Sequence, residues 1–122
     1  MKKILFIEDE AALQRAMTQA VQEAGYAVLS ALDGEIGIRL AEKEMPDLIL
    51  CDLILPKKNG LEVIEALKKN PSTADIPIIV LSNLEDTQNI QKAMELGVHS
   101  YLVKTSYTLD EVMSKIRQAM GE

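Results

Sequence analysis

The stretch Leu48-Ile49-Leu50-Cys51-Asp52 places four apolar residues in a row directly before a carboxylate. An unbroken apolar run of this length, unlike an alternating one, is typical of a strand buried on both faces of a sheet. Four other short apolar runs occur along the chain: Ile4–Ile7, Ala27–Ala31, Ile78–Leu81 and Tyr101–Val103. With Leu48–Cys51, these runs predict five strands.

The segments between these runs place apolar residues at helical spacing, which predicts amphipathic helices. The first set comprises Leu13, Met17, Ala20, Val21 and Ala24. We predict Glu10 as the N-cap of this helix and Gly25 as its C-cap. Asp33 and Thr108 are predicted N-caps of two later helices, and Glu111 completes a capping box with Thr108.

Strands and helices alternate strictly, with no linker or repeat between them. This alternation predicts parallel strands joined by right-handed crossovers, with helices on both faces of the sheet. Five strands fit an α/β, flavodoxin-like, doubly wound (βα)5 sandwich with the strand order 2-1-3-4-5. The length of 122 residues suits one such domain, so we expect a single domain over residues 1–122.

The charge balance excludes several classes of ligand. Thirteen basic and nineteen acidic residues give a net charge of −6, spread evenly over both halves of the chain. Direct binding to nucleic acid or to an anionic membrane needs clustered Lys and Arg, so we expect neither. The single Cys51 and single His99 exclude a disulfide framework and a Cys or His metal cluster. We expect Cys51 in the core and His99 in a solvated loop.

The N-terminal apolar run Ile4–Ile7 is too short for a signal peptide, because three acidic residues follow it at once. No stretch approaches the ~20 apolar residues of a membrane span. We therefore predict a cytoplasmic protein.

Polar residues follow the predicted strands at the edge where such a sheet binds ligands. Glu8 and Asp9 follow the first strand, Asp52 the third, Ser82 the fourth and Lys104 the fifth. The first and third strands are neighbours in the predicted order, which brings the three carboxylates together. Close carboxylates repel one another and need a proton or a cation, and Mg²⁺ is the hard ion that such oxygens prefer.

Several phosphate chemistries are excluded by what this edge lacks. No glycine-rich phosphate loop follows the first strand, and Ser82 has no nearby histidine to act as a base. A phosphoryl group could still bind where Mg²⁺ bridges it to the carboxylates and Lys104 lies opposite. A carboxylate in that setting can act as a nucleophile, and Asp52 is the best candidate for an aspartyl-phosphate.

At this point the residues match a known family. The chain resembles the receiver domain of two-component response regulators, the CheY-like fold, over essentially its whole length. Four motifs carry the resemblance: Lys3–Glu10 with its acidic pair, Asp52–Gly60 with Pro four and Gly eight positions after Asp, Ile78–Ser82, and Gly97–Lys104.

The resemblance implies roles for these residues. Asp52 would be phosphorylated by a histidine kinase or a phosphotransfer protein, with Lys104 and Ser82 holding the phosphoryl oxygens. Asp9, Asp52 and the backbone carbonyl of Ile54 would ligate Mg²⁺ directly, and Glu8 would act mainly through water.

The resemblance also implies a switch. Tyr101 would turn inward as Ser82 moves toward the phosphoryl group, which biases the face formed by the fourth helix, fifth strand and fifth helix. That face would control an effector protein or an output domain outside this chain, and could form a homodimer on phosphorylation. The protein would be a signalling switch and not an enzyme, apart from self-catalysed phosphotransfer and autodephosphorylation.

Two positions depart from the family pattern. Thr105 follows Lys104 where the family usually has proline, so we expect no cis bond there, and the aim of Lys104 is in question. Asn83 is larger than the usual Ala or Gly and could narrow access for the phosphoryl donor. Ile54 and Leu84 offer no polar side chain to orient an attacking water, which predicts a persistent phosphoryl group.

Two other function classes remain open. A hydrolase of the dehalogenase type also uses an Asp nucleophile and Mg²⁺, but it needs an Asp-x-Asp motif that Glu8-Asp9-Glu10 does not supply. A degenerate receiver would act as a phosphorylation-independent interaction module. The retained acidic residues and Lys104 argue against it, whereas Asn83 and Thr105 leave it open.

Overall fold

The computed structural model describes residues 1–83 and 86–122. The strands are β1 (Lys3–Ile7), β2 (Ala27–Ala31), β3 (Leu48–Asp52), β4 (Ile78–Ser82) and β5 (Ser100–Val103). The helices are α1 (Ala11–Glu23), α2 (Gly34–Glu44), α3 (Gly60–Lys69), α4 (Thr87–Glu95) and α5 (Leu109–Ala119). Strands and helices alternate as predicted.

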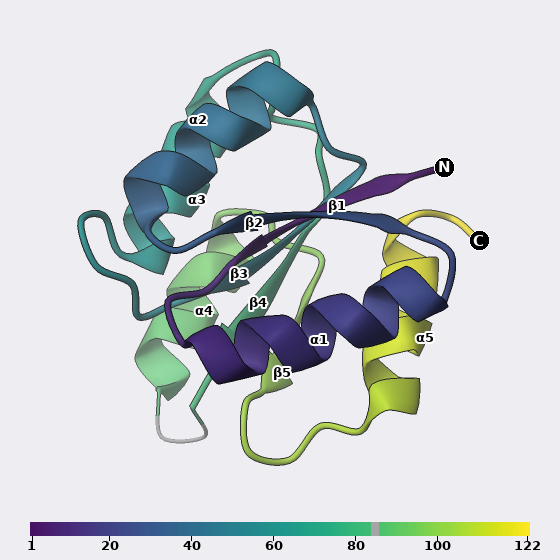
Figure 1. Ribbon diagram of the computed structural model, residues 1–122. Coiled ribbons are helices and arrows are strands. Elements are labelled where there is room, and N and C mark those ends of the chain that lie inside the picture. Colours follow the sequence, from purple (N-terminus) through teal and green to yellow (C-terminus); the bar gives the residue numbers. More distant parts are fainter. Residues whose placement is uncertain (84–85) are drawn as a thin grey trace.

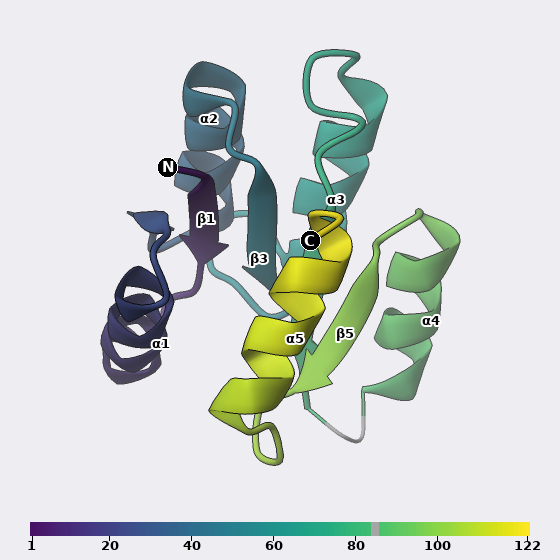
Figure 2. The ribbon, with the colours of Figure 1, turned by 90° about the vertical axis from the view of Figure 1, so that its right-hand side faces the viewer.

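The five strands form one parallel sheet in the order β2-β1-β3-β4-β5, which confirms the predicted topology. Every residue of β3 and β4 is buried, as the unbroken apolar runs predict. Helices α1 and α5 cover one face of the sheet, and α2, α3 and α4 cover the other (Figures 1 and 2).

Each face of the sheet packs its own core. Met17, Val21, Val112 and Ile116 of α1 and α5 bury their side chains against one face. Val63, Ile64 and Leu67 of α3, with Ala41 and Ala93, do the same on the other face. Cys51 lies in this second core and His99 is exposed in the loop before β5, so both predictions are confirmed.

Four strands are one residue longer than the apolar runs suggest. The added residues are polar or charged: Lys3, Asp52, Ser82 and Ser100. Strand pairing uses backbone groups, so the hydrogen-bonded ladder continues past the point where the side chains change character. As a result Asp52 and Ser82 are the last residues of their strands, which holds their backbones more firmly than a loop would.

The helix ends agree in part with the predicted caps. Asp33 accepts a hydrogen bond from the backbone amide of Ile36 at 2.9 Å, as predicted for an N-cap. Thr108 accepts one from the amide of Glu111 at 3.1 Å, but the described contacts include only this half of the predicted capping box.

At α1 the predicted caps, Glu10 and Gly25, agree with the structure in part. Glu10 occupies the N-cap position without a capping hydrogen bond from its side chain. The C-cap is Ala24, and Gly25 lies one residue further on with a φ of 101°, a conformation that glycine adopts at little cost.

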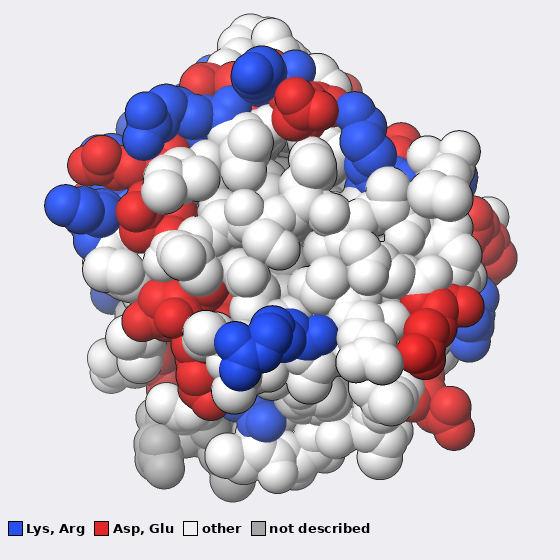
Figure 3. All heavy atoms as spheres, viewed as in Figure 1, with Lys and Arg blue, Asp and Glu red and all other residues white. Residues whose placement is uncertain are grey.

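Charged side chains of both signs are interspersed on the face shown in Figure 3, and most lie around its rim. No large patch of Lys and Arg is visible on the described part of this face. Within the described ranges, no helix has the length and apolar character needed to cross a bilayer.

Candidate functional site

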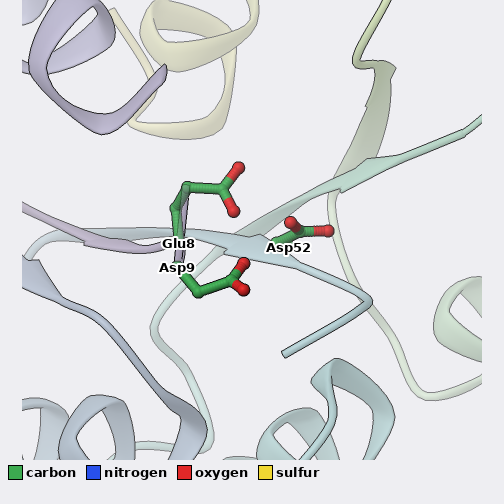
Figure 4. Close-up of side chains that lie close together, drawn as sticks. All are labelled: Glu8, Asp9 and Asp52. Carbon is green, nitrogen blue, oxygen red and sulfur yellow. The ribbon is translucent and has the colours of Figure 1, made fainter. Parts of the chain in front are cut away.

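Glu8, Asp9 and Asp52 lie together at the carboxyl edge of the sheet (Figure 4). Ile7 of β1 is paired with Cys51 of β3, so the residues that follow them emerge side by side. One carboxylate oxygen from each of the three acidic residues lies within 4.8 Å of the others. Glu8 and Asp52 are buried, whereas Asp9 is exposed, so the cluster opens to solvent on the side of Asp9.

Lys104 reaches this cluster from the end of β5. Its Nζ donates a hydrogen bond to Oδ2 of Asp52 at 2.7 Å and lies 3.1 Å from Oε1 of Glu8. Its own backbone amide donates to the carbonyl of Ser82 at 2.8 Å, which continues the β4–β5 pairing up to the site. Residues 1–83 and 86–122 contain no cis peptide bond, so Thr105 follows Lys104 through a trans bond. Although Thr105 stands where the family usually has proline, the ammonium of Lys104 still points at Asp52.

The charges of the cluster shift its ionisation. Burial raises the pKa of Glu8 to about 8, and the hydrogen bond and negative charge of Asp52 act in the same direction, against the opposing effect of Lys104. Partial burial lowers the pKa of Lys104, but its contacts with Asp52 and Glu8 outweigh that effect, so the pKa is raised. Near neutral pH the metal-free site therefore tends to keep a proton on Glu8.

The donor set fits a hard divalent cation. Oε1 of Glu8 is buried and, within the described part of the chain, accepts no hydrogen bond, although it lies at ion-pairing distance from Lys104. The other oxygen, Oε2, accepts a long hydrogen bond of 3.4 Å from the amide of Glu10. All three side chains offer carboxylate oxygens, the ligands that Mg²⁺ prefers. The site residues are thus compatible with the predicted Mg²⁺.

Asp52 is held in place on both of its oxygens. Its Oδ1 accepts a hydrogen bond from the backbone amide of Ile54 at 3.1 Å, and its Oδ2 accepts from Lys104. Only 2 % of its surface is exposed. Burial, together with the charges of Asp52 and Glu8, raises the pKa of the neighbouring Cys51 thiol.

The two predicted switch residues lie apart from the carboxylates. The hydroxyl of Ser82 is buried and has no hydrogen-bond partner among the described residues. Tyr101 is 42 % exposed on β5 and lines a surface recess of about 350 Å³ with Met94, Ser106 and Lys115. The structure therefore places Tyr101 on the outer face between α4 and α5 and not in the acidic cluster.

Asn83, one of the two departures from the family pattern, lies with Ile54 at the rim of the site. Ile54 is 61 % exposed, and Asn83 is also exposed and lines a recess with Ile54, Asp86 and Asn89. Leu84, which also carries the prediction of a persistent phosphoryl group, lies outside the described residues.

The sequence reasoning missed Gln14. Its buried amide Nε2 lies 3.2 Å from the carbonyl of Glu8 and 3.1 Å from that of Ala31, and donates to both. It thereby ties the start of α1 to the end of β1, where Glu8 and Asp9 emerge. The available signal was a glutamine within the apolar set of the first helix, next to Leu13 and three positions before Met17.

The fold and the acidic edge together define a phosphoacceptor class of α/β domain. A family model for the response regulator receiver domain matches residues 4–117, and the chain belongs to this family. Two relatives are each 36% identical to it: a probable transcriptional regulator ycf27 of Porphyridium aerugineum, over 119 residues, and the DNA-binding dual master transcriptional regulator RpaA of Synechocystis, over 117 residues. These matches cover 98% and 96% of this chain but 48% of each relative, so the chain spans about half the length of these relatives.

Solved structures agree with this assignment. A response regulator receiver domain protein from Clostridium thermocellum superposes with a TM-score of 0.92 at 27% identity, covering 99% of this chain and 95% of that one. The receiver domain of a sensor histidine kinase from Pseudomonas aeruginosa superposes with a TM-score of 0.90 at 25% identity, covering 99% and 98%. That second structure holds a magnesium ion coordinated in its active-site cleft.

Proposed function

We propose that this receiver domain accepts a phosphoryl group on Asp52 in a Mg²⁺-dependent reaction. The observation that carries the proposal is the environment of Asp52: a buried carboxylate hydrogen-bonded to Lys104 at 2.7 Å and clustered with Glu8 and Asp9. The donor is a histidine kinase or a phosphotransfer protein, or a small acyl phosphate in its place.

The chemistry follows from the residues present. A carboxylate oxygen of Asp52 attacks phosphorus, a new P–O bond forms, and the bond to the donor's nitrogen or oxygen breaks, with the electron pair leaving on the donor. Asp9, Asp52 and the backbone carbonyl of Ile54 would hold Mg²⁺, and Glu8 would act mainly through water. When bound, Mg²⁺ supplies positive charge to the phosphoryl oxygens.

Two other residues serve the phosphorylated state. Lys104 lies close enough to Asp52 to pair its ammonium with a phosphoryl oxygen once the carboxylate is esterified. The buried hydroxyl of Ser82, which has no partner among the described residues, is free to donate a hydrogen bond to the same group. To make this hydrogen bond Ser82 moves toward the phosphoryl group, and this movement is coupled to an inward turn of Tyr101. The face formed by α4, β5 and α5 then carries the signal.

The output lies outside the described fold. The relatives are about twice as long and two are named as transcriptional regulators, one of them DNA-binding, so a further domain or a partner protein supplies the output here. We expect no direct contact of this domain with nucleic acid, since its acidity is spread evenly along the chain. It acts as a signalling switch, and its only chemistry is phosphotransfer and autodephosphorylation.

Intact-mass measurement after incubation with acetyl phosphate and Mg²⁺ tests the proposal. We expect the mass to rise by one phosphoryl group, and we expect no rise when a chelator removes Mg²⁺ before the donor is added. Asp52→Asn is the matched variant, because it keeps the side-chain shape and removes the nucleophile. If the wild-type protein never gains mass while it still binds a partner, the phosphorylation-independent module is correct; the retained and clustered site residues do not favour that outcome.

A further inference from the structure

The N-terminus of α2 packs against the loop that leaves Asp52. Gly34 is the first residue of α2 and is buried. Its backbone amide donates a hydrogen bond to the carbonyl of Pro56 at 3.3 Å. A Cβ atom added to Gly34 would lie 2.1 Å from the carbonyl oxygen of Lys58 and 2.9 Å from its carbonyl carbon. Because these are backbone atoms, no side-chain rotation can relieve the overlap.

The loop that meets Gly34 runs from Leu53 to Asn59 and connects Asp52 to α3. At its start, the amide of Ile54 donates to Oδ1 of Asp52. At its end, the amide of Gly60 donates a hydrogen bond to the carbonyl of Leu53 at 2.9 Å. A capping box between Asn59 and Glu62 then begins α3. These contacts hold the two ends of the loop, and the contact with Gly34 lies between them.

The middle of the loop also holds a strained residue. Lys57 has a φ of 70°, a left-handed conformation that residues with a Cβ seldom adopt. Such a conformation persists when the surrounding contacts hold it in place. The packing of Gly34 on Pro56 and Lys58, on either side of Lys57, is a contact of this kind.

We propose that Gly34 is a positioning residue for the acceptor and metal site. By allowing α2 to approach the loop closely, it sets where the backbone of Ile54 lies relative to Asp52. The inference rests on the proposed function, since the backbone of Ile54 matters only if it helps to orient Asp52 and to hold Mg²⁺. Gly34 touches neither the carboxylates nor the metal, so it acts only through the loop.

The test compares Gly34→Ala with Gly37→Ala. In Gly34→Ala the carbonyl of Lys58 must move by about 1 Å to reach an ordinary contact distance. Gly37 lies on the same helix and is also buried, but its added Cβ would meet the side chain of Ile7, at 2.5 Å from Cδ1, 2.9 Å from Cγ1 and 3.0 Å from Cγ2, and not the loop. Gly37→Ala therefore controls for a general loss of stability in α2.

Three readouts separate positioning from stability. In Gly34→Ala we expect faster hydrogen exchange at the amide of Ile54 in the metal-free protein, a Mg²⁺ affinity lower by about tenfold, and slower phosphorylation by acetyl phosphate at saturating Mg²⁺. In Gly37→Ala we expect a lower melting temperature with all three readouts close to wild type. Equal effects in both variants, or an unchanged Ile54 amide and Mg²⁺ affinity in Gly34→Ala, would overturn the proposal.

Two further results complete the test. If Gly34→Ala does not fold, hydrogen exchange in the wild-type protein tests the same coupling. Mg²⁺ should slow exchange at the Gly34 amide, which donates to the carbonyl of Pro56, together with exchange at the Ile54 amide, and an unchanged Gly34 amide contradicts the inference. If the wild-type protein binds no Mg²⁺ and gains no mass, the proposed function fails. Exchange at the Ile54 amide still decides whether Gly34, and not Gly37, holds the loop.

Discussion

At the scale of single residues, the ammonium of Lys104 faces a cluster of three carboxylates and contacts two of them. Lys104 contacts Asp52 and Glu8, while Asp9 lies on the exposed side of the cluster. If all three acids ionise, the local charge stays negative, and the buried Glu8 is the one that holds a proton. A divalent cation bound at the cluster would offset its negative charge in place of that proton. We therefore expect metal binding and deprotonation of Glu8 to be linked.

The stability of the metal-free protein should fall as the pH rises from about 5 to about 9. The pKa of Glu8 in the folded protein is raised from the usual 4.5 to about 8. The folded state therefore keeps a proton that the unfolded state has released. This contribution is fully present below the unfolded pKa and is lost as the pH rises through the folded one. We expect the melting temperature, measured in chelator, to fall by several degrees or more across this range.

The matched variant for that measurement is Glu8→Gln, a neutral side chain of nearly the same shape. It should melt with little dependence on pH over the same range. Identical pH profiles for the two proteins would mean that Glu8 does not hold the proton.

The phosphoryl group should persist on the isolated domain. Ile54 is 61 % exposed at the rim and offers no polar atom to an attacking water. Ile54→Asn introduces an amide at this place and should speed loss of the phosphoryl mass by about an order of magnitude. Ile54→Val keeps the position apolar and should match wild type. A wild-type half-life of seconds, measured by intact mass after removal of the donor, would contradict the prediction.

At the scale of elements, the two ends of α2 are built differently. Its N-terminus has a well-formed cap, in which Asp33 binds the amide of Ile36. Its C-terminus ends on Met45 in the left-handed conformation, with a φ of 47°. A side chain with a Cβ is strained there, whereas glycine is the usual residue at such an end.

Met45→Gly should therefore stabilise the protein by about 1 kcal/mol, because it removes strain while the half-exposed Met45 side chain contributes little packing. Urea unfolding would show the change as a higher midpoint with an unchanged slope. Met45→Ala is the control, since it shortens the side chain but keeps the Cβ. An equal gain in the alanine variant would show that the left-handed backbone is not the cause.

The element-scale comparison also shows why the order of the elements was easier to predict than their ends. Short apolar runs identified all five strands, and in β3 and β4 these runs are continuous because burial on both faces leaves few positions for polar residues. The apolar runs stop one residue short of Asp52 and Ser82, although the hydrogen-bonded ladder includes both. The second half of the capping box at Thr108 was also predicted but is not among the described contacts, because a sequence spacing does not fix a rotamer.

At the scale of the whole molecule, the proposed acceptor site and the proposed signalling face meet at β5. Lys104 at the end of this strand contacts Asp52, and Tyr101 within it stands 42 % exposed between α4 and α5. A rearrangement at Asp52 can therefore be transmitted to the outer face through Ser82 and the backbone bond that joins it to Lys104.

Phosphorylation should convert the domain from a monomer to a homodimer through this face. Light scattering coupled to size exclusion, with acetyl phosphate and Mg²⁺ present, should report about twice the chain mass. Asp52→Asn, treated identically, should remain monomeric. A protein that carries the phosphoryl mass and still elutes as a monomer would show that the switched face binds a different partner.

The sequence by itself determined the sheet order and the set of residues at its carboxyl edge. Hydrophobic runs and helical spacing are local properties, and strict alternation of the elements leaves few topologies open. Only the tertiary structure decided that Lys104 points at Asp52 across 52 positions of sequence despite Thr105. Only it showed that Gly34 packs closely against the backbone of the loop after Asp52. Those contacts depend on how separate elements pack to within a fraction of an ångström, and neither pattern nor spacing along one chain encodes that distance.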